Sequence, residues 1–509
     1  MTFPMKIQAP NKYFLPKQVA LIAQALKKTD STAYLVGGIL RDSILKIKNP
    51  DIDIAVVGNA MNVGNAIANI INGKCFELDS LRGTYRVISS DFKPTTQIDV
   101  ATVQTGIHCD LAKRDFTINT LALDLKAVNF VQSVPQFSIS QIINDHNGIA
   151  DLDNSLLRMT NSRVFAEDPL RILRAVRLAA QIGLTFDEQT KAQIKKNNVL
   201  ISAISGERIR EEFLKLLSME NTVANLKTLD SLGILTNIIP ELELCRKTEQ
   251  NMNHHWKVLD HMVETAGQVE NIVTGKIINT GPFPEFIADY IPITDLHRNY
   301  FNQIYSEGHN RLTLLKLSSI LHDIGKPDTK TVQADGKIRF LTHEKLGGEI
   351  TYSILKRLKF SNLGVELIKN QVENHLRPSQ ISNAGEKPTL KAIRKFYRDT
   401  KDASLDILYL NMADYIAAKG PNLTRKEWKD HCRKVEIIQN NESSYKKATN
   451  QRKLLSGHDI MVGLCLKPGP LIGILIEEVE ESRMEGLVSN KEEALELIRH
   501  RMTSGEYIA

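Results

Sequence analysis

The pattern of hydrophobic and polar residues changes character near residue 135. Before it, short apolar runs separated by turn residues predict the strands of a small mixed sheet, at 34–36, 52–57, 85–88 and 97–101. Residues 16–30 have the periodicity of an amphipathic helix. From Pro169 onward helical periodicity dominates, with long segments at 168–183, 187–196, 206–219 and 222–232. The pattern predicts an α+β protein, with a mixed-sheet head followed by an elongated all-α body.

The chain is too long for one hydrophobic core, because its 509 residues exceed the usual size of a single domain. We predict a head at 1–135, a helical neck at 136–235, a helical body at 236–440 and a helical tail at 441–509. Residues 270–310 are richer in Pro and aromatic residues, and we expect a loop insertion between two helices there.

Composition excludes some classes of protein but does not identify a function. With 42% hydrophobic and 24% charged residues, the chain is an ordinary globular protein rather than a disordered or fibrous one. A net charge of +6 fits a nucleic-acid partner but does not demonstrate one. The five cysteines form no C-x-x-C pair, which argues against a zinc ribbon or a disulfide framework. Without an export signal or a membrane span, we expect a cytoplasmic protein with no membrane partner.

A glycine pair follows the first apolar run. Gly37 and Gly38 precede Arg41 and put backbone without side chains at the mouth of a predicted helix. Amide N–H groups and the helix dipole favour a phosphate at such a position. Taken alone, the pair is more often just a tight turn, because glycine is the usual residue there.

Three acidic residues lie in or beside predicted strands. Asp51 and Asp53 are two residues apart, so on a strand their carboxylates project from the same face, and Asp99 lies in the apolar run QIDVA. Three such acids suit a site for two Mg²⁺ ions that activates a hydroxyl and neutralises a departing pyrophosphate. The alternative makes Asp51 a turn residue after Pro50 and Asp53 an exposed strand position.

The segment AEDPLRILRAVRLAA begins a helix and offers a pairing edge. Asp168 suits the helix cap, which is a sufficient structural explanation. Asp168 and Arg171 are three residues apart and can face the same way, so they can accept from the amino group and donate to the ring nitrogen of cytosine or adenine. Uracil and guanine present the wrong polarity. Arg174 and Arg177 continue this face toward a triphosphate, although charged helix positions are more often solvated.

Six segments then resemble, in the same order, the motifs of class II tRNA nucleotidyltransferases and bacterial poly(A) polymerases, members of the polymerase β-like superfamily. They are YLVGGILRD, NPDIDIAVVG, KRDFTINTLALDL, DHNGIADLDNSLLR, AEDPLRILRAVRLAA and SGERIREEFLKLL, over residues 34–217. The resemblance implies template-independent addition of nucleotides from CTP and ATP to the 3′ end of tRNA. It also implies that the acceptor arm of tRNA binds to Lys and Arg residues of the body.

The resemblance assigns roles to individual residues. It implies that Asp51 and Asp53 bind the catalytic Mg²⁺ ions and that Asp99 completes the set. The residues implied to hold the ribose and the triphosphate are Arg114, Asp115 and Asn119. The E-D-x-x-R motif, with Glu167 supporting Asp168 and Arg171, would be the amino-acid template for CTP and ATP.

One segment departs from the family pattern. Only VATVQTGIHCDLAK separates Asp99 from Arg114, whereas CCA-adding relatives have a longer, charged flexible loop there. Loss of that loop is associated with enzymes that add only CC. We therefore predict that the chain adds C well and the terminal A poorly, with a companion A-adding enzyme supplying the last residue.

A second set of polar residues lies in the helical body. His322 and Asp323 end an apolar helix, and further candidates are His261, His343, His375 and Asp414. Their order resembles the HD phosphohydrolase domain, which would bind one or two transition metals such as Ni²⁺, Mn²⁺ or Co²⁺. His255 is a rival for the first position, and a vestigial HD fold that only grips tRNA is the alternative. Residues 454–479 and 490–499 also resemble the tail of HD-containing bacterial members.

Two other functions stay open at this point. A poly(A) polymerase shares the head motifs and would make an ATP-only homopolymer. An HD phosphohydrolase would use the head merely to bind nucleotide or RNA.

Overall fold

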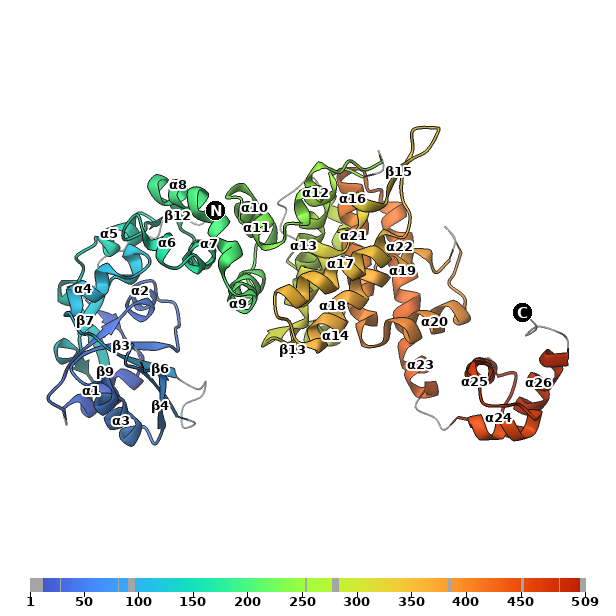
Figure 1. Cartoon of the computed structure of the whole chain (residues 1–509), viewed down its shortest axis with the longest axis horizontal. Coiled ribbons are helices and arrows are strands. Elements are labelled where there is room, and N and C mark those ends of the chain that lie inside the picture. The colour runs from blue at the N-terminus through green and yellow to red at the C-terminus, as the bar shows by residue number, and fades with distance from the viewer. Residues whose placement is uncertain are drawn as a thin grey trace. The chain divides into compact units, whose positions relative to one another are not determined.

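The computed structural model describes residues 12–27, 29–80, 82–89, 97–251, 254–276, 283–382, 386–449, 453–484 and 486–503. The chain forms two compact units, one of residues 1–243 with 357–359 and the other of residues 244–356 with 360–509 (Figure 1). Strands gather in the first unit, and the second is mainly helical, so the predicted α+β class is confirmed. Among the described helices, none has the length and apolar character needed to cross a membrane. The four-part domain division remains a prediction.

The head contains a seven-stranded mixed sheet. Its strands, in spatial order, are β10 (Ile142–Ile143), β7 (Ala122–Asp124), β2 (Thr32–Val36), β3 (Ile52–Val57), β6 (Gln97–Thr102), β5 (Thr84–Ile88) and β4 (Lys74–Asp79). β3 and β6 run parallel, and the other neighbouring strands are antiparallel. Each apolar run predicted to be a strand lies in this sheet.

Helices cover both faces of the sheet, but over different strands. α3 (Ala60–Ile70) packs on β4, β5 and β6, and α1 (Gln18–Leu26) packs on α3. The contact is so close that a Cβ on Gly64 would lie 2.8 Å from Cys75 Sγ. On the opposite face, α4 (Ile107–Ala112) contributes Ile107 and Leu111 to an apolar cluster with Val36 and Ala55 of β2 and β3. The face opposite α3 is the one that carries Asp53 and Asp99.

Two further parts complete the first unit. A three-stranded sheet joins β1 (Tyr13–Phe14), β9 (Val134–Phe137) and β8 (Asn129–Val131). The helices that follow include α5 (Gly148–Asp153), α6 (Val164–Glu167), α7 (Leu170–Ile182), α8 (Glu188–Asn197), α9 (Gly206–Leu217) and α10 (Thr222–Ser231). The apolar face of α7 is buried, and this helix packs on α9.

The second unit is built around α13 (Val258–Thr274), which is buried on nearly every side. It packs on α15 (Arg311–Leu321) and α21 (Ser404–Lys419), and α18 (Asn362–Asn374) packs on α15. Other helices of this unit are α17 (His343–Arg357), α20 (Leu390–Thr400) and α22 (Arg425–Asn440). Near the C-terminus, α24 (Gly457–Leu464), α25 (Pro470–Met484) and α26 (Lys491–Thr503) share an apolar cluster of their own.

The prediction of a loop insertion at 270–310 is wrong for most of that segment. α13 continues to Thr274, and the described part beyond it forms a 3-10 helix (Glu285–Tyr290), α14 (Asp295–Asn302) and β13 (Ile304–Ser306). Residues 277–282 lie outside the described residues. Ile287 and Phe301 are buried, and the Ile287 carbonyl accepts from Trp428 Nε1 at 2.8 Å. The apolar and aromatic residues of the segment therefore serve packing rather than a loop.

Candidate functional site

The turn between β2 and α2 (Gly38–Ile44) requires a glycine. Gly37 has φ of 75°, a left-handed conformation that side chains disfavour. A Cβ there would also lie 2.9 Å from Arg114 Nη1 and 3.4 Å from Asp53 Oδ2. At the predicted glycine turn, backbone without a side chain therefore lies close to the Asp53 carboxylate and the Arg114 guanidinium.

The candidate carboxylates lie together on one face of the sheet. Asp53 and Asp99 are register partners on β3 and β6, so their side chains project side by side. Asp51 directly precedes β3 and is exposed. Burial raises the pKa of Asp53, the Arg114 and Arg174 charges oppose the shift, and the Asp99 and Asp51 charges add to it. The three acids are therefore near enough to repel one another, as ligands of a shared cation would.

Arg86 is a residue that the sequence predictions omit. It is the register partner of Asp99 on the other side, and Nε and Nη2 each donate to one Asp99 oxygen at 2.7 Å. This hydrogen bonding raises the pKa of Arg86. Its signal in the sequence is a charged residue between the apolar positions Tyr85 and Val87, although nothing local says that β5 adjoins β6.

The motif containing Arg114 forms a hydrogen-bonded network. Arg114 Nη2 donates to Asp110 at 3.0 Å, and Asn119 Nδ2 donates to Asp115 Oδ1 at 2.9 Å. Arg41 is buried and donates to Asn119 Oδ1 at 2.6 Å, so it lies behind Asn119 rather than facing a ligand. Asn119 and Asp115 are thereby fixed in orientation.

A cavity of about 320 Å³ unites the head with the helix that follows it. Its lining residues are Gly37, Gly38, Asp53, Asp110, Lys113, Arg114, Asp115, Asn119, Asp168, Leu170, Arg171, Arg174, Arg208 and Glu212. The predicted residues absent from that lining are Asp51, Asp99, Arg41, Glu167 and Arg177. Five cationic side chains and five carboxylates line this cavity, and Asp53 is one of the carboxylates.

Asp168 and Arg171 both line the cavity but do not pair with each other. Asp168 accepts from the Leu170 backbone N–H at 3.2 Å and from Arg208 Nη2 at 2.9 Å. Arg171 donates to the Val164 and Lys113 carbonyls at 3.4 and 3.3 Å. Arg208 of α9 was missed in the sequence, although it lies within the SGERIREEFLKLL segment.

Arg174 and Arg177 diverge, contrary to the prediction that they continue one face. Arg174 Nε lies 3.0 Å from Asp115 Oδ2 and lines the cavity. Arg177 Nε donates to Glu212 at 2.6 Å, which turns it to α9 and away from the lining. Glu167 lies 3.8 Å from Arg171 and outside the lining as well.

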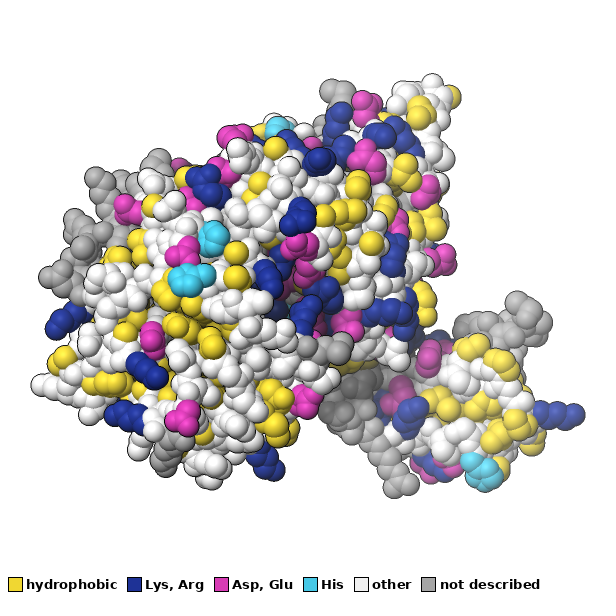
Figure 2. All heavy atoms as spheres, turned by 60° about the vertical axis from the view of Figure 1, so that its left-hand side comes forward, with side chains coloured by type: hydrophobic (Ala, Val, Ile, Leu, Met, Phe, Trp, Pro, Cys, Tyr) yellow, Lys and Arg dark blue, Asp and Glu magenta, His cyan; other side chains and the backbone are white. Residues whose placement is uncertain are grey.

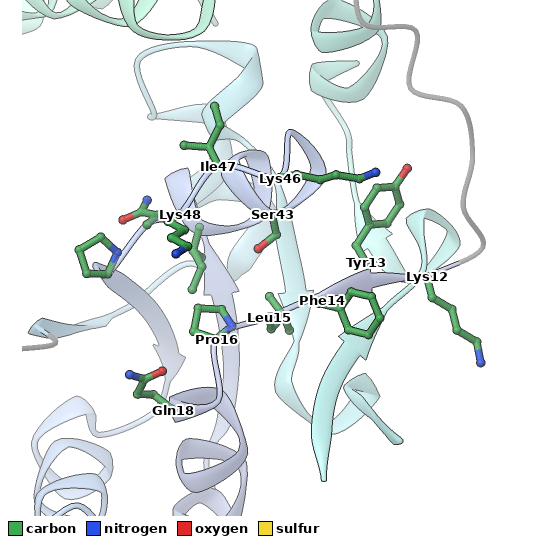
Figure 3. Close-up of a pocket in the computed structure, with 13 residues that line it drawn as sticks. Lys12, Tyr13, Phe14, Leu15, Pro16, Gln18, Ser43, Lys46, Ile47 and Lys48 are labelled. Atoms are coloured by element: carbon green, nitrogen blue, oxygen red, sulfur yellow. The ribbon is translucent and has the colours of Figure 1, made fainter. Parts of the chain in front are cut away.

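A second cavity of the head, about 720 Å³, borders the loop that leads to Asp51 (Figure 3). Strand β1 and residues 43–50 line it, with Phe14 65% exposed at its side. Lys46 and Lys48 come from the loop side of this cavity and Lys12 from the β1 side. None of the three predicted acids lines it, so it is separate from the carboxylate site.

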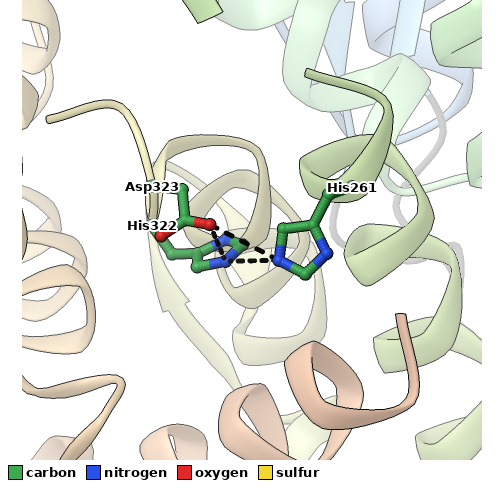
Figure 4. A group of neighbouring side chains, drawn as sticks. All are labelled: His261, His322 and Asp323. Carbon is green, nitrogen blue, oxygen red and sulfur yellow. Dashed lines mark hydrogen bonds and ion pairs between the residues drawn. The ribbon is translucent and has the colours of Figure 1, made fainter. Parts of the chain in front are cut away.

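The predicted HD residues of the second unit form overlapping groups of potential metal ligands. Figure 4 draws one of these groups, made of His261, His322 and Asp323. His261 Nε2 lies 3.2 Å from His322 Nε2, 3.4 Å from Asp323 Oδ2 and 3.0 Å from Asp414 Oδ1. His343 Nε2 and His375 Nε2 lie 3.2 and 3.7 Å from Asp323 Oδ1. His255 is exposed and packs against Trp256 and Gly420, outside this group.

Hydrogen bonds to the backbone orient three of these imidazoles. The Nδ1 atoms of His322, His343 and His375 contact the carbonyl three residues earlier, at 2.8, 2.7 and 2.7 Å. In a neutral ring, an N–H at Nδ1 leaves Nε2 as the lone-pair atom, and each of these Nε2 atoms points to the carboxylates. This donor set fits a divalent metal, since imidazole and carboxylate are its usual ligands and the second contact fixes the tautomer.

Lys326, missed in the sequence predictions, completes the charge balance of this cluster. Its Nζ lies 2.6 Å from Asp323 Oδ2 and donates to Gln250 Oε1 at 2.6 Å. Although burial opposes ionisation, His322 and Lys326 hold the pKa of Asp323 well below its usual range. Burial lowers the pKa of His375 to about 3, so this ring is neutral and able to ligate.

The molecular surface carries charges of both signs. Figure 2 shows Lys and Arg side chains interspersed with Asp and Glu on the visible face. This agrees with the mild net charge of +6.

Three sequence profiles match the chain. The poly(A) polymerase head domain matches residues 33–158, the probable RNA- and SrmB-binding site of polymerase A matches residues 183–245, and the HD domain matches residues 297–419. The first includes the candidate carboxylates, and the third includes His322, Asp323, His343, His375 and Asp414.

Two relatives align over almost the full length. An A-adding tRNA nucleotidyltransferase of Deinococcus radiodurans is 28% identical over 91% of this chain and 94% of its own. A CC-adding tRNA nucleotidyltransferase of Thermus thermophilus is 27% identical over 92% of this chain and 93% of its own. A CCA-adding enzyme of Limosilactobacillus reuteri is 34% identical, over 45% of this chain and 56% of its own.

Solved structures share the fold. A CCA-adding enzyme in an apo form has a TM-score of 0.60 and 19% identity, covering 95% of this chain and 93% of that one. The Thermotoga maritima CCA-adding enzyme complexed with tRNA has a TM-score of 0.55 and 19% identity, covering 95% and 94%.

Proposed function

We infer that this chain, which belongs to the family of tRNA nucleotidyltransferases and bacterial poly(A) polymerases, is a metal-dependent enzyme that adds CMP from CTP to the 3′ end of tRNA without a nucleic-acid template. The observation that supports this best is the pair Asp53 and Asp99, side by side in register at the edge of a cavity walled by Arg114, Arg171 and Arg174. Carboxylates suited to Mg²⁺, next to a cavity that also offers guanidinium groups, suit the triphosphate of a nucleotide.

The reaction follows from these groups. The 3′ hydroxyl of tRNA attacks the α-phosphorus of CTP, a P–O bond forms, and the bond to the β-phosphate breaks to release pyrophosphate. Asp51, Asp53 and Asp99 would hold Mg²⁺, which supplies charge neutralisation at the attacking and leaving oxygens. Arg114 and Arg174 would bind the triphosphate, while Asp115 and Asn119 would hold the ribose hydroxyls.

Base selection would depend on Asp168 and Arg171. In the proposed complex, Asp168 accepts from the cytosine amino group and Arg171 donates to the ring nitrogen. In the structure, Arg208 donates to the Asp168 carboxylate. On binding of the base, Arg208 would either share this acceptor with the cytosine amino group or move away from it. UTP would leave both protein groups without partners, which penalises it.

We propose that addition stops after CC. The segment between Asp99 and Arg114 is short, and most of it forms the end of β6 and helix α4. Ile107 and Leu111 of α4 are buried in the sheet contact, so this segment is committed to packing and has little length left for a flexible loop. A companion enzyme would then add the terminal A.

An extension assay tests both parts of the proposal. Purified enzyme is incubated with tRNA lacking its CCA end and with CTP, ATP or both, and the product ends are sequenced. We expect two C residues from CTP and little A addition, with Asp53→Ala inactive. Efficient CCA synthesis would contradict the restriction to CC, and an A homopolymer from ATP alone would favour a poly(A) polymerase.

We also propose a phosphohydrolase side activity at the HD cluster. The cluster retains buried imidazoles whose Nε2 atoms face two carboxylates, and the pKa values of both carboxylates are held low. A vestigial site would need neither feature. His261, His322, Asp323, His343, His375 and Asp414 would hold Ni²⁺, Mn²⁺ or Co²⁺, which would polarise a phosphoryl group and activate water.

Hydrolysis of 2′,3′-cyclic nucleotides with each metal tests this second activity. We expect turnover by the wild type, none by His322→Ala or Asp323→Ala, and unchanged turnover by Asp51→Ala, whose nucleotide transfer is lost. Lack of metal-dependent turnover in the wild type would eliminate the hydrolase proposal and leave nucleotide transfer untouched.

We propose a cytoplasmic location for the enzyme. A tRNA substrate and the free thiols of Cys75, Cys109, Cys245, Cys432 and Cys465 support it.

A further inference from the structure

A row of side chains crosses four strands on the carboxylate face of the head sheet. Register pairs Phe76 of β4 with Arg86 of β5, Arg86 with Asp99 of β6, and Asp99 with Asp53 of β3. Directly paired residues on neighbouring strands project from the same face. Phe76 and Arg86 therefore continue the line of the proposed catalytic acids toward the edge of the sheet.

The two ends of this row differ in what surrounds them. Beside Asp53 lies the cavity with the arginines proposed to hold the triphosphate, whereas Asp99, Arg86 and Phe76 are outside its lining. In phosphoryl transfer the attacking and leaving oxygens lie roughly in line on opposite sides of the phosphorus. With the triphosphate in the cavity, the attacking 3′ hydroxyl has to approach the acids from the Asp99 side.

The outer part of the row is accessible. Phe76 is 49% exposed, Leu78, two residues further along β4, is 50% exposed, and Lys74 is exposed as well. α4 packs on the same face, but over β2 and β3 through Val36 and Ala55. Exposed rings also lie on the edge strands β1 and β8, at Phe14 and Phe130. Phe76 is therefore distinguished by its place in the row with Asp99 and Asp53, not by its exposure alone.

The face of β4 and β5 opposite Phe76 contacts helix α3. The register partner of Cys75 is Val87, and both pack from the opposite face against α3 at Gly64. Arg86 is fixed by its two hydrogen bonds to Asp99. Phe76 thus lies on a strand whose other face contacts α3, and next to an oriented cation. A side chain placed by a paired strand loses little conformational freedom on contacting a ligand.

We propose that β4 and β5 bind the single-stranded 3′ end of the RNA, with a terminal base stacked on Phe76 and the RNA backbone attracted by Lys74 and Arg86. Aromatic rings in a cationic setting are the usual platform for single-stranded RNA, and stacking tolerates any base. Phe76 and Asp99 are two strand spacings apart, about 10 Å, a distance that the last nucleotides of an RNA strand can bridge. The inference rests on the proposed nucleotidyl transfer, to which it adds the binding site of the second substrate.

Phe76→Ala and a matched control test the platform. Phe130 is 47% exposed on β8, in the other sheet of the same unit, so Phe130→Ala removes an equally exposed ring away from the row. We expect Phe76→Ala to raise the KM for tRNA about tenfold, as loss of one stacked base predicts, and to change the KM for CTP less than about twofold. Phe76→Trp should retain the wild-type KM for tRNA, and Phe130→Ala should match the wild type.

Binding of fluorescein-labelled tRNA that lacks its CCA end, measured without CTP, gives a readout independent of turnover. Phe76→Ala should weaken this binding relative to Phe130→Ala. Equal KM values and equal binding for these two variants would overturn the inference. If circular dichroism shows that Phe76→Ala does not fold, Phe76→Leu replaces it, since leucine keeps apolar volume without a ring to stack. Equal KM values and equal RNA binding for Phe76→Leu and Phe76→Trp would then overturn the inference.

The binding measurement also separates this inference from the proposed function. A wild type that adds no nucleotide contradicts nucleotidyl transfer, whereas the comparison of Phe76→Ala with Phe130→Ala in RNA binding still decides the role of β4.

Discussion

The pKa values of two buried histidines in this protein are shifted in opposite directions by their neighbours. His322 is fully buried, yet the adjacent Asp323 and Asp414 outweigh the burial and raise its pKa to about 10. His431 has a centroid 4.3 Å from the Tyr415 ring and stacks nearly parallel to it, and burial lowers its pKa to about 4. One ring belongs to a charged cluster and the other behaves as an aromatic core residue.

The stacked His431 predicts a pH dependence of stability. The unfolded chain protonates this ring near its ordinary pKa of about 6.5, and the folded chain only near 4, so the stability due to the neutral ring is complete above about pH 6.5 and is lost as the pH falls toward 4. At about pH 5 the loss should be about 2 kcal/mol. Urea unfolding at about pH 5 and pH 7.5 should show a smaller loss in His431→Phe. Equal pH dependence of the two proteins would contradict this assignment.

Substitution of Gly37 should have two effects, one from backbone strain and one from contact with Arg114. Gly37→Ala should lower stability by about 1–2 kcal/mol through its positive φ and should also raise the KM for CTP, because the new Cβ would displace Arg114. Gly308 has φ of 72°, and a Cβ added there would meet no other atom within 4 Å, so Gly308→Ala carries the strain alone. Kinetics of both variants should show the KM change only in Gly37→Ala.

At the level of elements, Tyr300 joins the segment expected to be a loop to a buried ion pair of the helical body. Arg311, the first residue of α15, is 3% exposed, and its Nη1 donates to Asp406 Oδ2 of α21 at 2.7 Å. Tyr300 of α14 donates to the same oxygen at 2.6 Å, and the guanidinium lies 4.3 Å from the Tyr300 ring centroid. The pair therefore connects α14, α15 and α21.

A double-mutant cycle should reveal this connection. Arg311→Met is expected to cost about 3–5 kcal/mol, because it leaves the Asp406 charge buried and unpaired. Asp406→Leu should also be costly, and the double variant should lose less than the sum of the two single losses. Urea unfolding followed by circular dichroism measures all four proteins. Additive losses would show that the two side chains do not depend on each other.

Some elements could be predicted from local pattern and others could not. The short apolar runs predicted to be strands lie in the head sheet, and α7 begins directly after Pro169, which is its N-cap residue. The segment 283–310 misled the prediction because proline and aromatic residues also occur at the ends of short helices. Ile287 and Phe301 become core residues only through α22 and α21, which are more than a hundred residues away in sequence.

At the scale of the whole molecule, the two proposed activities lie in different compact units. The carboxylate row and its cavity belong to the first unit, and the HD cluster belongs to the second. A ligand that binds one folded unit stabilises that unit by mass action, about 2.7 kcal/mol at a hundredfold excess over Kd.

Thermal unfolding should therefore respond separately to the two kinds of ligand. We expect two calorimetric transitions in metal-stripped protein. CTP with Mg²⁺ should raise the midpoint temperature of one, and Ni²⁺, Mn²⁺ or Co²⁺ should raise that of the other. His322→Ala should abolish only the second shift. A single transition that both ligands raise equally would show that the units unfold as one.

The sequence by itself identified most of the candidate residues, because the features involved are local. A glycine pair after a strand, two acids with a strand repeat and the His-Asp pair at a helix end can all be identified without knowing the fold. Only the tertiary structure decided which of these groups meet. Strand order places Asp99 between Asp53 and Arg86, and helix packing turns Arg177 to Glu212 and Arg208 to Asp168. The physical reason is that register and helix packing depend on contacts between distant residues, which hydrophobic periodicity does not record.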